Sequence, residues 1–380
     1  MTRNVRPVRS RKMKLVVPDK IMIVTVIVLL AVGLLFVFSS SSVTTAMTSA
    51  FNNDPFYYLK RQVGWMLAGL LAAVVAMVIN INLLRRYSAW LYLISVVLLA
   101  LVLFTNLGSE AGGATRWLEF GQIRFSPSEI AKIAMVLAVA HFIAANRPAI
   151  KQFTQVLLPC LIMLLIIVGL IYKQPDLGTT AVIVGTFFIM FFVGGARILH
   201  LLVCLAAAAA GLAISIYVAP YRMDRYIAFL DPWSYASDEG FQIIQSLYAL
   251  GSGGWTGVGL GESMQKLFHL PAQHTDFIFS IIGEEWGFLR AVLIIFLFFL
   301  FVWRGLVIAW EAPDFYMAMV AVGLTGLIGL QAAVNIAVAI GAMPVSGLTL
   351  PFISYGGTSL VFTLISVGIL LNISRYKAKA

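Results

Sequence analysis

The amino-acid sequence predicts an all-α polytopic membrane protein, and three observations support this fold class. First, 61% of the 380 residues are hydrophobic and only 11% are charged, whereas soluble domains carry about 25% charged residues. Second, about ten apolar stretches are each long enough to cross a bilayer as a helix. Third, basic residues gather at both ends of the chain, where the positive-inside rule expects them beside cytoplasmic helix ends.

The predicted spans begin after a basic segment and continue almost to the end of the chain. Their expected bounds are residues 20–40, 62–80, 84–105, 127–145, 153–172, 178–195, 198–219, 275–303, 316–342 and 351–373. The first stretch is long for the apolar region of a signal peptide, so we interpret it as a retained helix. The eighth stretch exceeds one bilayer crossing, and we expect its first turns at or outside the membrane surface.

An even number of spans puts both termini on one side, and the basic ends assign that side to the cytoplasm. We therefore expect a basic cytoplasmic leader (1–19), a single ten-span membrane domain (20–373) and a short basic cytoplasmic tail (374–380). The longest polar connection, residues 220–274, then lies on the outer face between spans seven and eight. Its length is typical of a functional segment, and residues 242–250 within it predict a short amphipathic helix.

Composition also bears on which functions to expect. The net charge of +10 is concentrated beside apolar spans and has no aromatic-basic platform with it, which argues against nucleic-acid binding. Cys160 and Cys204 both lie inside apolar runs, so they form neither a disulfide framework nor a metal set. The sequence predicts no resident metal site.

Charged side chains at membrane depth are costly, and four motifs that carry them lie on the predicted outer half. In the first motif, Arg116 stands beside Trp117. A guanidinium can pair with a phosphate through two hydrogen bonds. The same pair of residues can equally be an anchor at the membrane interface.

The second motif opens the fourth span. Ser126 and Glu129 fit the first and last positions of a helix capping box, which gives Glu129 a structural explanation. Lys132 is one turn deeper. It can pair with Glu129 across three residues, or the pair can offer a cation to a phosphate.

The third motif, Lys173–Gly178, connects spans five and six. Pro175 and Gly178 favour a tight turn, and Asp176 can cap the helix that follows. Lys173 is one more cation on the outer half. The pattern is explained by a well-built turn, although a substrate-binding role stays open.

The fourth motif begins at His274 and places Asp276 where an apolar helix starts. On a helix, Ser280, Gly283 and Gly287 would lie within about 40° of Asp276. Such a stripe of small residues allows another helix or a ligand to approach closely. We therefore expect a close neighbour or a ligand beside the Asp276 carboxylate.

Three carboxylates in ten residues exceed what helix capping requires. This favours Asp276 as a functional group, with Glu284 and Glu285 as structural partners. His274 is an alternative base. Further along, the uncharged segment 344–357 is rich in proline and glycine and predicts a bent turn sheltered by protein, which can shape a cavity.

Taken together, these motifs resemble the SEDS family (shape, elongation, division and sporulation). The matching segments are Thr115–Trp117, Ser128–Lys132, Gln174–Gly178, Phe229–Pro232, Gln245–Leu247, Gly251–Gly254, Gly257–Gly261, His274–Phe277 and Leu350–Gly357. Segments Ser263–Phe268 and Asp231–Trp233 resemble the division-type (FtsW-like) branch more than the elongation-type (RodA-like) branch. Ala272 departs from the pattern, because many relatives carry an acidic residue there.

The resemblance implies a peptidoglycan glycosyltransferase that polymerises lipid II into glycan strands at the outer face of the bacterial inner membrane during cell division. It also implies a class B penicillin-binding protein transpeptidase as partner, together with other division proteins. Asp276 corresponds to the essential aspartate of the family and would act as general base. No cofactor is certain, although a divalent cation can share the work of stabilising the leaving diphosphate.

The expected site combines the residues singled out above. The expected substrate-binding residues are Arg116, Glu129, Lys132, Lys173, His274 and Ser354. The expected structural neighbours are Asp176, Gly253, Gly259, Glu284 and Glu285. Two other functions fit a membrane protein with a large outer loop: a lipid II flippase or transporter, and a non-catalytic scaffold that activates a transpeptidase.

Overall fold

The structure is a computed structural model. It describes residues 14–15, 17–105, 108–111, 114–120, 123–267 and 270–377. Most of the expected basic leader, the last three residues of the tail, Gly113 and Phe268 lie outside the described residues.

Among the described residues, ten helices are long and apolar enough to cross a membrane, which confirms the predicted fold class. They are α1 (Lys20–Met47), α2 (Tyr57–Val78), α3 (Ile81–Phe104), α4 (Pro127–Ala145), α5 (Leu158–Lys173, extended by a π-helical turn at Phe153–Leu157), α6 (Leu177–Gly194), α7 (Ile198–Val218), α10 (Ile278–Glu311), α11 (Phe315–Ala339) and α12 (Gly357–Ser374). The predicted bounds are closest for the middle helices. The last helix begins at Gly357 and not at residue 351, because the preceding proline- and glycine-rich segment is a loop.

Shorter elements lie mainly between these helices. They are the helices α8 (Pro220–Leu230) and α9 (Phe241–Gly253), the 3-10 turns Ser49–Phe51, Arg147–Ala149 and Trp233–Tyr235, and the strands β1 (Lys14–Leu15), β2 (Gly108–Ala111), β3 (Ala114–Phe120), β4 (Ile123–Phe125) and β5 (Tyr376–Lys377). Helix α9 confirms the short helix predicted at 242–250. The antiparallel sheet β2-β3-β4 and helix α8 were not predicted.

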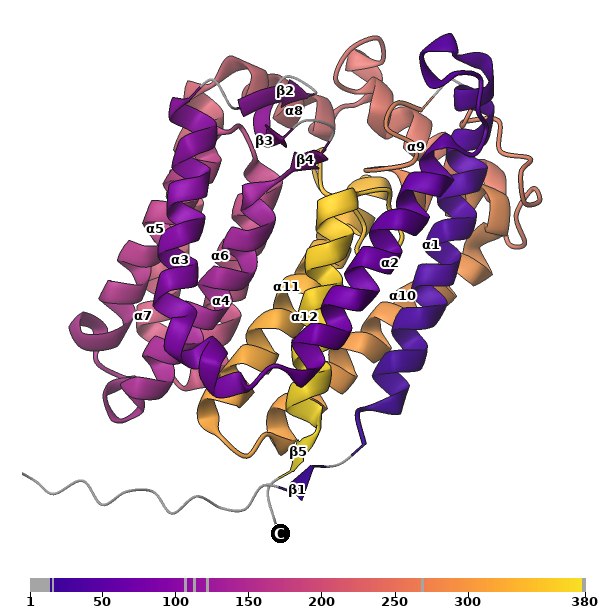
Figure 1. The fold of residues 1–380 in the computed structure, drawn as a ribbon. Coiled ribbons are helices and arrows are strands. Elements are labelled where there is room, and N and C mark those ends of the chain that lie inside the picture. The colour runs from indigo at the N-terminus through magenta and orange to yellow at the C-terminus, as the bar shows by residue number, and fades with distance from the viewer. Residues whose placement is uncertain are drawn as a thin grey trace, which may run out of the picture.

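The two ends of the helix bundle differ in character (Figure 1). Strands β1 and β5 pair with each other, so both ends of the described chain lie together at what we call the terminal end. This agrees with an even number of spans. Arg304 bonds to Asp19 there, and Arg85 lies 3.6 Å from Asp314. The sheet β2-β3-β4 and helices α8 and α9 occupy the opposite end, which we call the loop end.

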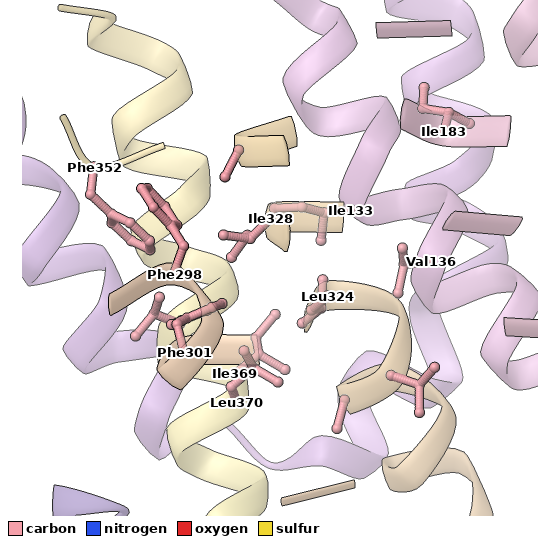
Figure 2. Close-up of a cluster of buried hydrophobic side chains, with 14 of the residues drawn as sticks. Ile133, Val136, Ile183, Phe298, Phe301, Leu324, Ile328, Phe352, Ile369 and Leu370 are labelled. Atoms are coloured by element: carbon pink, nitrogen blue, oxygen red, sulfur yellow. The ribbon is translucent and has the colours of Figure 1, made fainter. Parts of the chain in front are cut away.

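The apolar core runs through the bundle, and Figure 2 shows the part of it that lies among α4, α6, α10, α11 and α12. Phe352, from the loop before α12, contacts Phe298 and Phe301 of α10, with ring centroids 6.5 and 5.6 Å apart. Helix α1 closes over this loop at Gly33, where a Cβ atom would lie 2.4 Å from the carbonyl oxygen of Phe352. Close backbone approach through small residues is how helices pack in a membrane. The loop is thereby held inside the protein, as its sequence predicted.

Helix α10 is broken at Gly287, whose φ of 78° is not helical. The break removes two helical hydrogen bonds, and the glycine-rich segment 254–259 replaces them. The carbonyl groups of Glu284 and Glu285 accept from the backbone N–H groups of residues 258 and 259, at 3.0 and 3.2 Å. The N–H groups of residues 288 and 289 donate to the carbonyls of residues 254 and 255. A Cβ atom on Gly257 would lie 2.1 Å from the Glu285 carbonyl oxygen, so only glycine fits.

Contrary to the prediction from the sequence, the stripe of small residues in the fourth motif does not share a helix face with Asp276. Helix α10 begins at Ile278, so Asp276 precedes the helix and sits in the turn formed by residues 271–277. Ser280 contacts Ser246 of α9 at 2.5 Å, and a Cβ atom on Gly253 would lie 2.0 Å from the Gly283 carbonyl oxygen. The stripe therefore packs against α9, and it is not the surface from which a ligand could approach Asp276.

Candidate active site

A cavity of about 850 Å³ opens at the loop end of the bundle. Its walls come from α2, the strands β3 and β4, the start of α4, the start of α6, helix α11 and the loop before α12. Seven ionisable acidic or basic side chains line it: Arg61, Arg116, Glu119, Arg124, Glu129, Asp176 and Asp276. The cavity therefore gathers charges from segments that are far apart in the sequence.

The turn that carries Asp276 is held by three hydrogen bonds to consecutive carbonyl groups. The backbone N–H of Tyr355 donates to the carbonyl of His274 at 2.9 Å. The Ser354 hydroxyl donates to the carbonyl of Thr275 at 2.5 Å, and the Asn335 amide donates to that of Asp276 at 2.8 Å. These donors come from α11 and from the loop before α12. The core thus fixes the backbone of Asp276 while its side chain faces the cavity.

The environment of Asp276 changes its acidity. Burial raises the pKa of its carboxyl group from the usual 3.8 to about 6, and the nearby Arg116 opposes this rise. A carboxylate with a raised pKa is a stronger base and is still ionised at neutral pH. Asp276 is therefore electrostatically suited to accept a proton.

Arg116 faces the same point as Asp276. Its guanidinium donates to the carbonyls of Gln174 and Pro175 at 3.2 and 2.6 Å, and it lies 3.7 Å from an Asp176 carboxylate oxygen. A Cβ atom on Gly347 would be 3.5 Å from Arg116 Nη1 and 4.0 Å from Asp276 Oδ2. The Arg116 cation and the Asp276 carboxylate thus border one open spot, which exists because Gly347 has no side chain.

The predicted pair of Glu129 and Lys132 is formed, with 2.9 Å between the charged atoms. Lys132 is only 3% exposed, and its ammonium also donates to Gln331 at 2.8 Å. The Gln331 amide in turn donates to the carbonyl of Thr349. Glu129, Gln331 and Thr349 line the cavity, and Lys132 lies behind them. Any influence of Lys132 on a ligand in the cavity would therefore pass through these three side chains.

The two predicted helix caps have different outcomes. Asp176 caps α6, since its side chain accepts from the backbone N–H of Thr179 at 3.0 Å. At α4 the predicted positions are confirmed, with Ser126 at the N-cap and Glu129 in the first turn, but the predicted capping bond of Ser126 is wrong. Ser126 precedes the helix, but its hydroxyl contacts that of Ser128 at 2.9 Å and makes no cap bond. The Glu129 carboxylate does not serve as a cap, because it pairs with Lys132 one turn deeper.

Besides Lys132, three residues predicted to bind substrate lie outside the cavity lining. The Lys173 ammonium lies 5.9 Å from the centre of the Phe104 ring. His274 packs against Tyr58 at a tilt of 35°, with ring centroids 4.4 Å apart, and burial lowers its pKa to about 4, so it is neutral at pH 7. Ser354 is used in the hydrogen bonds that hold the Asp276 turn.

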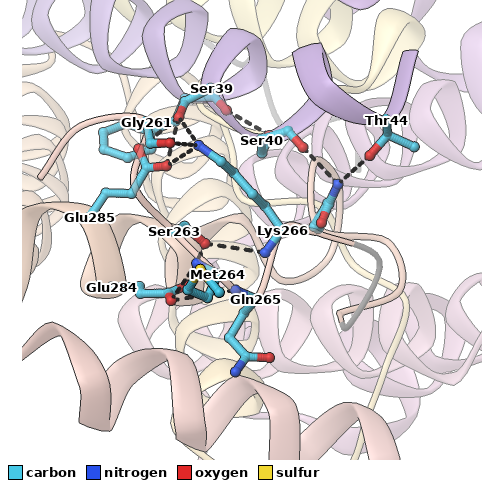
Figure 3. A network of polar contacts seen from close by, with 12 residues as sticks. Ser39, Ser40, Thr44, Gly261, Ser263, Met264, Gln265, Lys266, Glu284 and Glu285 are labelled. Carbon is cyan, nitrogen blue, oxygen red and sulfur yellow. Dashed lines mark hydrogen bonds and ion pairs between the residues drawn. The ribbon is translucent and has the colours of Figure 1, made fainter. Parts of the chain in front are cut away.

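Glu284 and Glu285 belong to a separate polar network (Figure 3). Glu285 is fully buried and pairs with Lys266 at 2.8 Å, and the Ser39 hydroxyl of α1 donates to it at 2.7 Å. Glu284 accepts from the Ser263 hydroxyl at 2.5 Å and from the backbone N–H of Met264 at 3.0 Å. Both carboxylates hold the long loop against α10 and α1, and neither lines the cavity.

The two predicted glycines act in the same region. Gly253 permits the close packing of α9 on α10 described above. Gly259, with a φ of 120°, continues the backbone that fills the break at Gly287. Both positions support the loop and are away from the cavity.

Sequence reasoning missed several residues of the cavity. Arg61 near the start of α2 and Arg124 on β4 both line it, and so does Tyr355. Arg124 is the cross-strand neighbour of Glu119, and they form an ion pair at 2.5 Å. Arg61 was detectable as a cation near the expected outer end of the second span, but nothing in the sequence linked it to residue 355.

Within the described residues, no group of three or more His, Cys, Asp or Glu side chains could hold a metal ion. Magnesium is often bound by only one or two carboxylates together with substrate phosphates.

Comparison with known proteins identifies the family. The family model described as "Cell cycle protein", which covers FtsW, RodA and SpoVE, matches residues 19–379. The chain therefore belongs to this family, the SEDS family named above on its motifs, and it is a multi-pass membrane protein.

Individual relatives agree with this assignment. The chain is 42% identical over 359 residues to "Stage V sporulation protein E" of Bacillus subtilis (strain 168). The aligned region covers 94% of this chain and 97% of that protein. It is 39% identical over 356 residues to "Probable peptidoglycan glycosyltransferase FtsW" of Geobacter sp. (strain M18), covering 94% and 96%. Its relatives thus include proteins of sporulation and proteins named as peptidoglycan glycosyltransferases.

A solved structure has the same fold. It was described under "Structural coordination of polymerization and crosslinking by a peptidoglycan synthase complex". The two chains share 35% sequence identity and superpose with a TM-score of 0.78, over 94% of this chain and 98% of the other. The ten-helix architecture with a large connection before α10 is therefore that of a SEDS protein.

Proposed function

We propose that the protein is a peptidoglycan glycosyltransferase that polymerises lipid II, with Asp276 as the general base. The observation that carries this proposal is that Asp276 and Arg116 border one open spot beside Gly347. Glycosyl transfer from a lipid diphosphate needs a base for the attacking hydroxyl and a cation for the leaving group. The two groups lie where both tasks can be done at one reacting centre.

The proposed reaction follows from these two groups. The acceptor sugar hydroxyl gives its proton to the Asp276 carboxylate while its oxygen forms a bond to the anomeric carbon of the donor sugar. The bond from that carbon to the diphosphate oxygen breaks, and the diphosphate leaves with the electron pair. Arg116 Nη1 faces this developing negative charge, which a fixed cation stabilises.

The basic segments at the two ends of the chain support an outward-facing cavity, because both ends of the described chain lie at the terminal end of the bundle. Arg85, Arg147, Arg304 and Arg375 belong to helix ends and turns at the terminal end of the bundle. Basic residues are retained on the cytoplasmic side of a membrane. The termini would then be cytoplasmic, and the cavity would open at the outer face, where a lipid-linked donor can reach it from the bilayer.

The proposed partner is a class B penicillin-binding protein transpeptidase, acting with other division proteins at the septum of the bacterial inner membrane. The solved relative comes from a complex that polymerises and crosslinks peptidoglycan, which supports a partner of this kind. The 39% identity to a protein named FtsW favours division, and the 42% identity to a sporulation protein leaves a sporulation role as the second candidate.

The deciding experiment combines purified protein, a class B partner whose transpeptidase serine is replaced, and labelled lipid II. Glycan polymer on a gel supports the proposal, provided that Asp276→Asn in the same complex makes none. If the wild-type complex makes no polymer but lipid II crosses liposomes that contain the protein, the transporter is the correct function. If it does neither and only stimulates crosslinking by an intact partner, the protein is a scaffold.

A further inference from the structure

The three arginines that line the cavity differ in their partners. Arg116 lies 3.7 Å from Asp176, and Arg124 is paired with Glu119 at 2.5 Å. No ion pair joins Arg61 to a carboxylate in the part of the chain that the structure describes. Arg61 thus brings a positive charge to the cavity that none of these carboxylates offsets.

Aromatic side chains hold Arg61 in position without neutralising it. Its guanidinium lies 4.7 Å from the centre of the Tyr57 ring, and it is close enough to the Tyr355 phenol to oppose the rise that burial causes in the pKa of that phenol. The first turns of α2 are packed against the start of α12, since a Cβ atom on Gly357 would lie 2.6 Å from the Trp65 indole. A guanidinium that faces an aromatic ring and forms no ion pair retains donors for a phosphate.

We propose that Arg61, with Tyr57 and Tyr355, binds the diphosphate of the acceptor lipid. This inference rests on the proposed function, and it assigns a second anion site within the same cavity. Two lipid-linked sugars must meet in the reaction, and each brings its own diphosphate. Arg116 beside Asp276 serves the diphosphate that leaves, so the acceptor needs a separate cation.

The position of Arg61 fits the acceptor. The acceptor hydroxyl must reach Asp276, whereas the acceptor diphosphate is attached at the other end of its disaccharide. Arg61 lies on the α2 wall of the cavity and connects to the Asp276 turn through Tyr355, whose backbone N–H donates to the carbonyl of His274 at 2.9 Å. Arg61 is thus connected through Tyr355 to the loop that holds the Asp276 turn, but it does not border the open spot beside Gly347.

The test uses a lipid II analogue whose non-reducing 4-hydroxyl is blocked, so that it can act only as donor. Initial rates of coupling between this analogue and ordinary lipid II are measured while one of the two is varied. Arg61→Gln should raise the half-saturating concentration of ordinary lipid II about 10- to 100-fold, the range for a lost hydrogen bond to a charged group. That of the blocked donor should stay within about twofold. Arg61→Lys should recover most of the loss because it keeps the charge.

Lys60→Gln is the matched control, because it removes the same charge one residue away. Lys60 is 68% exposed, pairs with Asp54 at 2.7 Å and does not line the cavity. If Arg61→Gln behaves like Lys60→Gln, Arg61 is a surface residue and the proposal is wrong. If Arg61→Gln weakens the blocked donor instead, the assignment to the acceptor is wrong.

A binding measurement separates this proposal from the proposed function. Undecaprenyl diphosphate is titrated into protein in nanodiscs of neutral lipid, with pyrophosphate and then phosphatidylglycerol as competitors. Weaker undecaprenyl diphosphate binding by Arg61→Gln supports the anion site even if the wild-type protein makes no polymer. Equal displacement by phosphatidylglycerol or by pyrophosphate alone would make the site a general phosphate site and overturn the acceptor assignment.

Discussion

Two sets of carboxylates lie within ten residues of each other and have opposite surroundings. Glu284 and Glu285 are buried, and partners within the protein satisfy both of them, including the Lys266 ammonium. Asp276 has its backbone fixed by three hydrogen bonds, while its side chain faces a cavity and a cation across an open spot. The comparison teaches that a charge in a membrane protein points to function when a cavity is left beside it, and to structure when the protein satisfies it.

The energetic consequences of the two sets also differ. Removing one partner of a buried ion pair leaves an uncompensated charge and typically costs 3–5 kcal/mol. Removing the charge of Asp276 should not weaken the fold. Its pKa is raised from 3.8 to about 6 in the folded protein, so its ionisation disfavours folding at any pH above about 6, and this penalty is absent below about 3.8. Mutations can therefore test whether the two sets of carboxylates differ in this way.

The largest expected effect is on catalysis by Asp276→Asn. Asparagine keeps the size of the side chain but cannot accept the proton, and loss of a positioned base typically lowers the rate 10²–10⁴-fold. Polymer yield from the purified complex measures this loss. The melting temperature at pH 7 should be unchanged or higher, because a costly ionised group has been removed.

Two results would contradict this prediction. Near-normal polymer from a complex that still contains its partner would remove Asp276 from the mechanism. A large fall in melting temperature would show that the carboxylate is structural, like its neighbours in α10.

The second prediction concerns Glu284 and Glu285, the carboxylates whose partners lie within the protein. Lys266→Ala should lower the free energy of unfolding by about 3–5 kcal/mol, because it leaves Glu285 charged and buried without its cation. Thermal unfolding in detergent is the measurement. The double variant Lys266→Met with Glu285→Gln should recover much of the loss. Activity per folded molecule should fall far less than in Asp276→Asn, and an equal fall would mean that the two sets are not separate.

The third prediction is a pH dependence. Asp276 must be ionised to act as base, so the rate should fall as the pH drops through about 6. Arg116 holds the pKa of Asp276 down, so Arg116→Gln should move this fall to a higher pH in addition to lowering the rate. The rate is measured between pH 5 and 8 at saturating lipid II. An unchanged profile in Arg116→Gln would show that the two charges do not interact.

The smallest effect is a labelling difference that tests the orientation of the two ends. In a chain without Cys160 and Cys204, Asp238→Cys should react with a membrane-impermeant maleimide from outside the cell, and Arg197→Cys should not. Lys266 would be an unsuitable outer reporter despite its place in the loop, because it is 3% exposed. Labelling at residue 197 and not at 238 would reverse the proposed orientation.

Much of the site could be predicted because local motifs carry it. Asp276 stands out next to an apolar stretch, and Arg116, Glu129 and Asp176 each lie in a short polar motif that the structure brings to the cavity. The roles of neighbouring residues could not be predicted in the same way. His274 and Ser354 belong to motifs that match the family. In the structure, however, the His274 ring packs against another ring, and the Ser354 hydroxyl bonds to a backbone carbonyl.

The sequence by itself determined the ten-helix membrane fold, the short helix α9 and the family, because apolar length and local motifs are properties of neighbouring residues. Only the tertiary structure decided which charges meet. It broke α10 at Gly287, filled the break with the glycine-rich segment, and buried Glu285 against Lys266. It also brought Arg61 and Tyr355 together across almost three hundred residues. Whether a charge is satisfied or left facing a cavity depends on these distant partners, and no local pattern contains them.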